Sequence, residues 1–261
     1  MKLIDSHCHL DFTVFDDDRE ALLARCRQQK ISGFVVPGVN AERWPALIDL
    51  VDKTEGMYGA LGLHPLFMSQ HRAEDLAQLR SSLDCWNAVA VGEIGLDFYH
   101  GKGGATEQIR LFESQLSIAK AFCLPVILHV RKAHDQVLAL LRRVRPEGGI
   151  VHAFSGSEQQ ALQYIALGFS LGVGGAVTYE RATRLRRTLS RLPLTALVLE
   201  SDSPDMLPAG AVRGGRNTPL CLPSVATVLS ELHQCSLAHI ALQTTNNVAL
   251  FLKLPLEGLS P

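Results

Sequence analysis

Residues 1–9 of the chain read Met-Lys-Leu-Ile-Asp-Ser-His-Cys-His. The apolar pair Leu3 and Ile4 predicts a short buried strand, and His7 and His9 follow where that strand ends. Side chains at positions i and i+2 of extended backbone point the same way, so the two imidazoles share one face. Two neutral imidazoles on one face can bind a divalent metal, although an isolated His-x-His also suits two polar residues in a turn. Further ligands elsewhere in the chain would favour the metal site.

Length and composition suit one large α/β domain. The chain has 261 residues, of which 47% are hydrophobic, and single α/β barrels typically contain about 250 residues. A formal net charge of −1 creates no global field for nucleic acid or membranes. This is weak evidence against a nucleic-acid substrate, because an enzyme needs only a local positive cleft.

Targeting and redox features point to the cytoplasm. Polar residues from Asp5 to Asp11 interrupt the apolar segment that a signal peptide needs, and no apolar run reaches the roughly 18 residues that span a bilayer. The six cysteines include no Cys-x-x-Cys pair, which is typical of reduced thiols. We therefore expect a cytoplasmic location, no membrane association and no obligatory protein partner.

Short apolar runs alternate with helical patterns along the whole chain. Besides the first strand, strands are predicted at residues 33–38, 57–63, 88–97, 125–131, 149–154, 169–173 and 196–202. Helices are predicted at residues 16–30, 40–53, 73–85, 106–122, 133–144, 157–167, 180–192, 223–233 and 237–252. Uniformly apolar strands fit a parallel sheet covered on both sides. Eight β-α units in a chain of this size predict an α/β fold of the (β/α)8 TIM barrel type, with residues 1–261 as a single domain.

The predicted strand ends carry histidines and acids. They are His7 and His9 on the first strand, then His64, Glu93, His129, His152 and Asp202 on the third, fourth, fifth, sixth and eighth. In a barrel these positions meet at the C-terminal mouth, where the active sites of this fold lie. Any one histidine alone could be a packing residue, but such a group needs a cation or many hydrogen bonds. Zn, Mn and related divalent ions accept imidazole and carboxylate ligands.

The remaining histidines lack this placement. They fall in predicted helices or loops, where a surface or packing role is expected: His71, His100, His134, His233 and His239.

Seven short motifs occur in a specific order. They are residues 5–10 (Asp-Ser-His-Cys-His-Leu), 62–65 (Gly-Leu-His-Pro), 92–97 (Gly-Glu-Ile-Gly-Leu-Asp), 129–131 (His-Val-Arg), 152–156 (His-Ala-Phe-Ser-Gly), 200–204 (Glu-Ser-Asp-Ser-Pro) and 216–219 (Arg-Asn-Thr-Pro). With these motifs the chain resembles, over essentially its whole length, the TatD-type metal-dependent hydrolases, within the amidohydrolase-like barrels. Glu93 stands where many of those barrels carry a carboxylated lysine, which favours the TatD branch.

The resemblance implies a binuclear site with two divalent metal ions per chain, of Zn, Mn or Mg. One ion would be held by His7, His9, Glu93 and Asp202, and the other by Glu93, His129 and His152. This chain departs from many relatives at Ser201, where they have Thr, and at Leu66, where they often have His or Trp. The second departure could alter the pocket wall and hence the choice of substrate.

The expected reaction is hydrolysis of a phosphodiester by a two-metal-activated water. The catalytic residues would be Asp202, which orients the water and takes its proton, with Glu93 and His64. His64 would bind a phosphate oxygen or assist the leaving group, or else be a polar plug in the mouth. Arg131 could hold a phosphate bidentately, or pair with a loop acid. Asp97 is expected to orient a ligand.

The predicted function is therefore that of a TatD-type phosphodiesterase or deoxyribonuclease, with DNA or another phosphodiester as substrate. An amide, lactone or aminoacyl-ester hydrolase on the same metals is the alternative, and a non-enzymatic metal-binding barrel is a third. Arg216 and Asn217 are expected to tie down the loop at 205–219. The arginines of 180–192 could track a nucleic-acid backbone, but a solvated helix face is the simpler interpretation.

Overall fold

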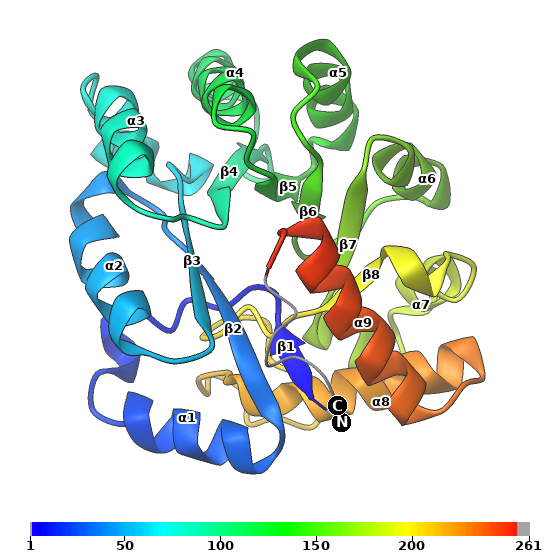
Figure 1. Ribbon diagram of the computed structural model, residues 1–261. Helices are drawn as coiled ribbons and strands as arrows, with labels where there is room; N and C mark the ends of the chain where they lie inside the picture. Colours follow the sequence, from blue (N-terminus) through cyan, green and yellow to red (C-terminus); the bar gives the residue numbers. More distant parts are fainter. Residues whose placement is uncertain (1, 255–261) are drawn as a thin grey trace.

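Eight parallel strands form the centre of the molecule. The computed structural model describes residues 2–254 and arranges the strands in the order β1 to β8, with the helices around them (Figure 1). The strands are β1 (Leu3–Asp5), β2 (Ile31–Pro37), β3 (Met57–Leu61), β4 (Ala90–Asp97), β5 (Val126–Arg131), β6 (Gly149–Val151), β7 (Phe169–Val173) and β8 (Leu197–Leu199). This architecture confirms the predicted (β/α)8 barrel, whereas the interpretation of residues 1–261 as one domain stays a prediction.

The helices follow the predicted order. They are α1 (Arg19–Gln28), α2 (Trp44–Lys53), α3 (Asp75–Cys85), α4 (Ala105–Ala121), α5 (His134–Val144), α6 (Glu158–Ala166), α7 (Thr183–Leu189), α8 (Leu222–His233) and α9 (Leu237–Phe251). All but α4 and α8 are shorter than predicted. A capping box opens α6, because Ser157 Oγ accepts the Gln160 N–H and Gln160 Oε1 accepts the Ser157 N–H. Within residues 2–254, no helix has the length and apolar character needed to cross a bilayer.

Successive side chains of each strand point alternately into the barrel and toward the helices. This alternation separates two apolar clusters and directs the candidate functional side chains inward. In β5, Ile127 belongs to a cluster that collects one residue from each of seven strands, whereas Val126 and Leu128 pack toward the helices. Side chains on one face of a strand recur every second residue. His129 therefore lies one layer above Ile127 on the inner face. His152 follows Ile150 in the same way.

One end of the barrel is closed by α9. Val248 and Ala249 of α9, with Leu252 just after the helix, belong to the same cluster as Ile127 and Ile150, and Figure 1 shows α9 lying across the barrel. The opposite end, where the strands finish, is left for the histidines and acids.

β6 and β8 each end three residues earlier than the sequence predicts. β6 stops at Val151 and β8 at Leu199, although strands were expected as far as residues 154 and 202. The backbone turns just beyond both ends, because Ala153 and Asp202 adopt left-handed φ values of 45° and 55°. Such values end a regular ladder, so His152 and Asp202 stand on turns at the mouth.

Hydrogen bonds between residues at the ends of β8 and β1 join the last strand to the first, and we call this junction the seam. The Ser6 N–H donates to the Leu199 carbonyl at 2.9 Å. The buried Asp5 carboxylate accepts the Ser201 N–H at 2.9 Å and the Ser201 hydroxyl at 2.5 Å. Just beyond, the Asp202 N–H donates to the His7 carbonyl at 2.9 Å. These bonds hold the predicted metal ligands that follow the two strands side by side.

Removing the Ser201 hydroxyl should weaken this seam. Ser201→Ala leaves Asp5 Oδ2 without its hydroxyl donor in a fully buried site, which should lower the free energy of unfolding by about 1–3 kcal/mol. Urea denaturation of the metal-free protein measures the change. The matched control is Ser81→Ala, since that exposed hydroxyl bonds only its own helix. Equal effects of the two substitutions would contradict the assignment.

Candidate metal centre

Glu93 lies at the centre of the strand-end cluster. Its side chain is 2% exposed. One carboxylate oxygen, Oε2, lies 3.1 Å from His7 Nε2 and 3.5 Å from His9 Nε2. The other, Oε1, lies 3.1 Å from His64 Nε2 and 3.0 Å from His129 Nδ1. Each oxygen of one carboxylate thus faces two imidazoles.

All seven strand-end residues lie together at the mouth. Their ligand atoms fall into three groups, in each of which the atoms lie within 4.8 Å of one another: His7, His9 and Asp202; His7, Glu93 and His152; His64, Glu93 and His129. The set predicted for the first ion is compact, because Glu93 also touches His7 and His9.

The set predicted for the second ion is grouped differently from the expectation. His64, rather than His152, accompanies Glu93 and His129. The His152 ring stacks on His7 with centroids 3.7 Å apart, whereas its centroid lies 6.5 Å from that of His129. The assignment of His152 to an ion shared with His129 stays a prediction.

The donor set fits divalent cations. His7 Nε2 and His9 Nε2 lie 3.3 Å apart, and Asp202 Oδ1 lies 3.7 and 3.9 Å from the same two atoms. Converging imidazole nitrogens and carboxylate oxygens in a buried position are the ligands that Zn and Mn take. Within the described part of the chain, the buried Nδ1 atoms of His7 and His9 also lack hydrogen-bond partners, so no protein acceptor fixes a proton there.

His64 is a neutral imidazole with a defined tautomer. Burial lowers its pKa to about 4, although the nearby Glu93 opposes this shift. The Leu66 N–H donates to Nδ1 at 3.1 Å, so the ring proton sits on Nε2 and is donated to Glu93. His71, expected to be a surface or packing residue, contacts the His64 carbonyl through its Nε2 at 2.8 Å. His71 therefore helps to position the backbone of His64.

Three histidines of the metal-free cluster have raised pKa values. Burial opposes protonation of His152, but the Glu200 and Asp202 carboxylates outweigh burial and raise its pKa to about 10. Burial also opposes protonation of His129, but hydrogen bonds with Asp97 and Glu93 raise its pKa. Burial opposes protonation of His9 as well, but Glu93 raises its pKa. A cation bound by His152 would have to displace its proton.

The pKa values of the two acids of the cluster, Glu93 and Asp202, are shifted in opposite directions. Burial alone would raise the pKa of Glu93, but His64, His7 and His129 together lower it well below its ordinary value. Burial raises the pKa of Asp202 to about 6. Glu93 is therefore a permanent anion, whereas Asp202 exchanges a proton close to neutral pH.

Sequence reasoning missed the role of Glu200. This fully buried carboxylate accepts the Ala153 N–H at 2.7 Å and lies 3.1 Å from His152 Nδ1. Gly172 gives it space, since a Cβ there would lie 2.1 Å from Glu200 Oε2. A signal was present, because Glu200 follows the inward-facing Val198 by two residues.

Asp97 contacts His129 and lies close to Arg131. Asp97 Oδ2 lies 2.9 Å from His129 Nε2, which is the orienting contact expected for Asp97. Arg131 lies 4.0 Å from the same carboxylate, with its guanidinium carbon 3.6 Å from the centroid of the Tyr99 ring. Arg131 thus faces an acid on β4 and also lines the cleft above the cluster.

The cleft above the cluster has a volume of about 560 Å³. Besides the cluster and Arg131, its lining includes an apolar wall made of Phe12, Leu66, Phe67 and Met206. A volume of this size suits a small molecule or part of a polymer.

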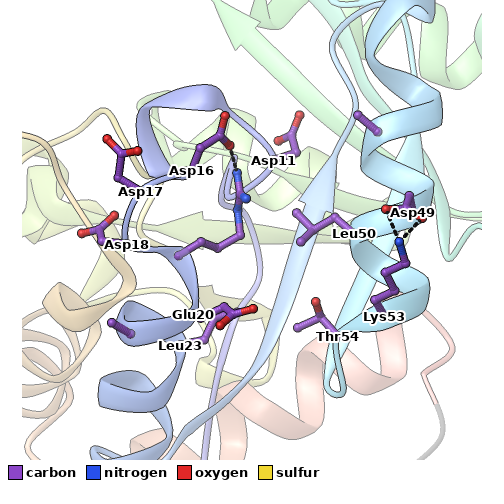
Figure 2. A pocket seen from close by; sticks show the side chains of 13 residues that line it. Asp11, Asp16, Asp17, Asp18, Glu20, Leu23, Asp49, Leu50, Lys53 and Thr54 are labelled. Atoms are coloured by element: carbon purple, nitrogen blue, oxygen red, sulfur yellow. Dashed lines mark hydrogen bonds and ion pairs between the residues drawn. The ribbon is translucent and has the colours of Figure 1, made fainter.

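A larger cavity, of about 620 Å³, lies between α1 and α2 (Figure 2) and contains none of the cluster histidines. Its lining is rich in acids, but Arg19 pairs with Asp16 and Lys53 pairs with Asp49. We assign the chemistry to the cleft at the strand ends.

The loop after β8 is tied down as expected. Arg216 pairs with Asp18 at 2.8 Å, and Asn217 Nδ2 donates to the Ser201 carbonyl at 2.8 Å. On the arginine-rich segment, Arg191 pairs with Glu158 and Arg186 donates to the Val177 carbonyl. These contacts favour the structural interpretation of that segment.

Comparison with known proteins agrees with this site. The family model described as TatD related DNase matches residues 4–253. The chain belongs to the TatD-related DNase family. It is 40% identical to the uncharacterized metal-dependent hydrolase YjjV of Escherichia coli (strain K12), with 97% of this chain and 99% of that protein covered.

A further TatD relative and the solved structure of YjjV are similar to this chain over nearly their full length. A Cronobacter sakazakii protein named 3'-5' ssDNA/RNA exonuclease TatD is 34% identical, with 96% of this chain and 98% of that protein covered. The crystal structure of YjjV, a TatD homolog from Escherichia coli K12, has a TM-score of 0.92, with 97% and 98% of the two chains covered.

Metal uptake by this TatD protein should release protons. His152, with its pKa raised to about 10, is protonated at neutral pH without metal, and a histidine ligand must be deprotonated. Raising the pH removes such protons, so affinity should rise by about tenfold per pH unit for each proton displaced. Calorimetric titration with Mn²⁺ in buffers of different ionisation enthalpy counts the protons. An affinity that stays constant between about pH 6 and pH 8 would contradict this.

Neutralising Glu200 should weaken metal binding without removing a predicted ligand. Glu200→Gln keeps the size of the side chain but withdraws the charge beside His152 Nδ1. The expected loss of metal affinity is about 10- to 100-fold, measured by calorimetry. Glu158→Gln is the matched control, because that exposed acid pairs with Arg191 on the outer surface. Unchanged affinity in Glu200→Gln would rule out the positioning role.

Proposed function

We propose that this TatD-family metal-dependent hydrolase is a nuclease that cleaves phosphodiester bonds of DNA with two divalent ions of Zn, Mn or Mg. The ions would be held by the predicted ligands His7, His9, Glu93, His129, His152 and Asp202. The observation that carries the proposal is the Glu93 carboxylate, whose two oxygens each face two imidazoles. A relative named as a single-stranded DNA and RNA exonuclease supports the choice of substrate.

Divalent ions in this position would activate water and offset the negative charge of the phosphate. Asp202 is suited to orient that water and accept its proton, because its side chain is 17% exposed and burial raises its pKa to about 6. A base with a pKa near neutrality accepts and returns a proton readily.

His64 and Arg131 supply contacts to the phosphate. Both line the cleft. His64 is uncharged at neutral pH because burial lowers its pKa to about 4. Its Nε2–H donates to Glu93 in the absence of metal, and it would become free to donate to a phosphate oxygen or to the leaving group once Glu93 binds the ions. Arg131 contributes a permanent positive charge.

A second function has some support from the cleft wall. Phe12, Leu66, Phe67 and Met206 give one side an apolar character, which would suit an amide, lactone or aminoacyl ester on the same metals.

The six cysteines are free, with Cys8, Cys26 and Cys221 buried, and reduced thiols support the expected cytoplasmic location.

The proposed function is tested with a single-stranded oligodeoxynucleotide. Purified protein loaded with Mn²⁺ or Mg²⁺ should release nucleotides, and removal of the ion with a chelator should stop the release. Glu93→Ala should lower kcat/KM by more than about 100-fold, because one carboxylate joins both halves of the site. Chromatography of the products measures the rate.

Glu113→Gln is the control, since that exposed acid on α4 pairs with Arg143 and lies outside the cleft. A panel containing an ester, a lactone and an amide runs alongside the oligonucleotide. Intact DNA together with cleavage of one of these would replace the nuclease proposal with the alternative.

A further inference from the structure

We propose that Arg131, held on the face of Tyr99, forms a subsite for a second phosphate, one nucleotide away from the bond that is cut. A substrate with two neighbouring phosphates would then be preferred over one with a single phosphodiester. This inference rests on the proposed function and adds a second phosphate-binding position to the same cleft. Tyr99 acts in it as a positioning residue for Arg131.

The strand places Arg131 beyond the cluster rather than within it. Arg131 follows His129 by two residues on β5, so both side chains project on the same face. Two residues of strand advance the chain by about 6.6 Å. The side chain of Arg131 is 47% exposed, whereas that of His129 is 15% exposed. The guanidinium therefore stands farther toward the rim, where a neighbouring part of the substrate would lie.

Stacking leaves the donors of Arg131 free. Its guanidinium carbon lies 3.6 Å from the centroid of the Tyr99 ring, and this contact uses the face of the planar group. The five N–H donors point outward in the plane. Within residues 2–254 the one carboxylate near them is Asp97, at 4.0 Å, which is too far for a hydrogen bond. Such a group is ready to bind phosphate oxygens in pairs.

Asp97 links the backbone at Tyr99 to the cluster. Its Oδ2 contacts His129 at 2.9 Å and its Oδ1 accepts the Tyr99 N–H at 2.8 Å. The Asp97 N–H in turn donates to Gln108 of α4 at 2.9 Å. The backbone that carries the Tyr99 ring is thus positioned relative to a predicted metal ligand.

Positive and negative charges lie on different sides of the cleft. Among the described residues that line it, Arg131 is the one arginine or lysine. The loop after β8 contributes Asp205 and Met206 instead. A second phosphate is attracted to the β5 side and repelled from Asp205. A neutral lactone or amide would gain nothing from Arg131.

The experiment compares three substrates with the Mn²⁺-loaded enzyme. They are thymidylyl-thymidine, which has one phosphodiester, and the same dinucleotide with an added phosphate on its 5′ or its 3′ end. One phosphorylated form should have a kcat/KM about tenfold above that of the parent, as expected for one charge-assisted contact. Arg131→Ala should bring this ratio close to one, and Arg131→Lys should give an intermediate ratio because it keeps the charge without the planar fork.

Variants of Tyr99 separate positioning from charge. Tyr99→Phe keeps the ring and should keep the ratio. Tyr99→Leu removes the ring and should lower the ratio mainly by raising KM for the phosphorylated dinucleotide. Arg181→Ala is the matched control, because Arg181 also lies over a tyrosine ring, that of Tyr179 at 5.0 Å, but does not line the cleft. It should leave the ratio at the wild-type value.

The outcomes distinguish this inference from the function on which it rests. Hydrolysis of the parent dinucleotide with no preference for either phosphorylated form would overturn the subsite and leave the nuclease proposal standing. No hydrolysis of any of the three would remove both. A ratio that survives in Arg131→Ala, or that falls equally in Arg181→Ala, would also overturn the subsite.

Discussion

One buried carboxylate among four imidazoles is the constraint on which the site depends. Glu93 lies within 3.5 Å of His7, His9, His64 and His129, in a position almost closed to water. An ionised carboxylate is costly to bury unless cations or hydrogen bonds surround it. The mutual attraction of Glu93 and the histidines therefore holds together side chains that four different strands contribute.

Closure of the barrel brings residues from the first and last strands together in the site. His7 and His9 come from the first strand and Asp202 from the end of the last, so the cluster exists only when β8 lies beside β1. The Asp5 carboxylate and Ser201 make that junction inside the protein, across a sequence separation of 196 residues. Closure of the fold and assembly of the site are in this respect the same event.

The fold and the membership of the cluster could be predicted because both depend on alternation along strands. Ile127 and His129, or Ile150 and His152, share a face through a period of two that is visible in the sequence. The finer arrangement depends on where the backbone leaves the ladder. His152 lies just beyond the early end of β6, next to the left-handed turn at Ala153, and stacks on His7, whereas His64 lies beside His129. Such contacts follow from local backbone turns, which no periodic pattern encodes.

Rigid and variable parts of the site have different origins in the chain. His129 stands on a strand whose hydrogen-bonded ladder fixes its position, whereas Leu66 stands on the loop after β3 and is 54% exposed. Loops tolerate substitution more readily than the strands they connect. The metal chemistry is therefore tied to the barrel itself, while the substrate wall can change without disturbing it. Arg131 is the exception, because the guanidinium that lines the cleft comes from β5 and stacks on the Tyr99 ring. A positive charge in this position would favour substrates with a phosphate at a defined distance from the predicted metal site over substrates that merely fit the wall.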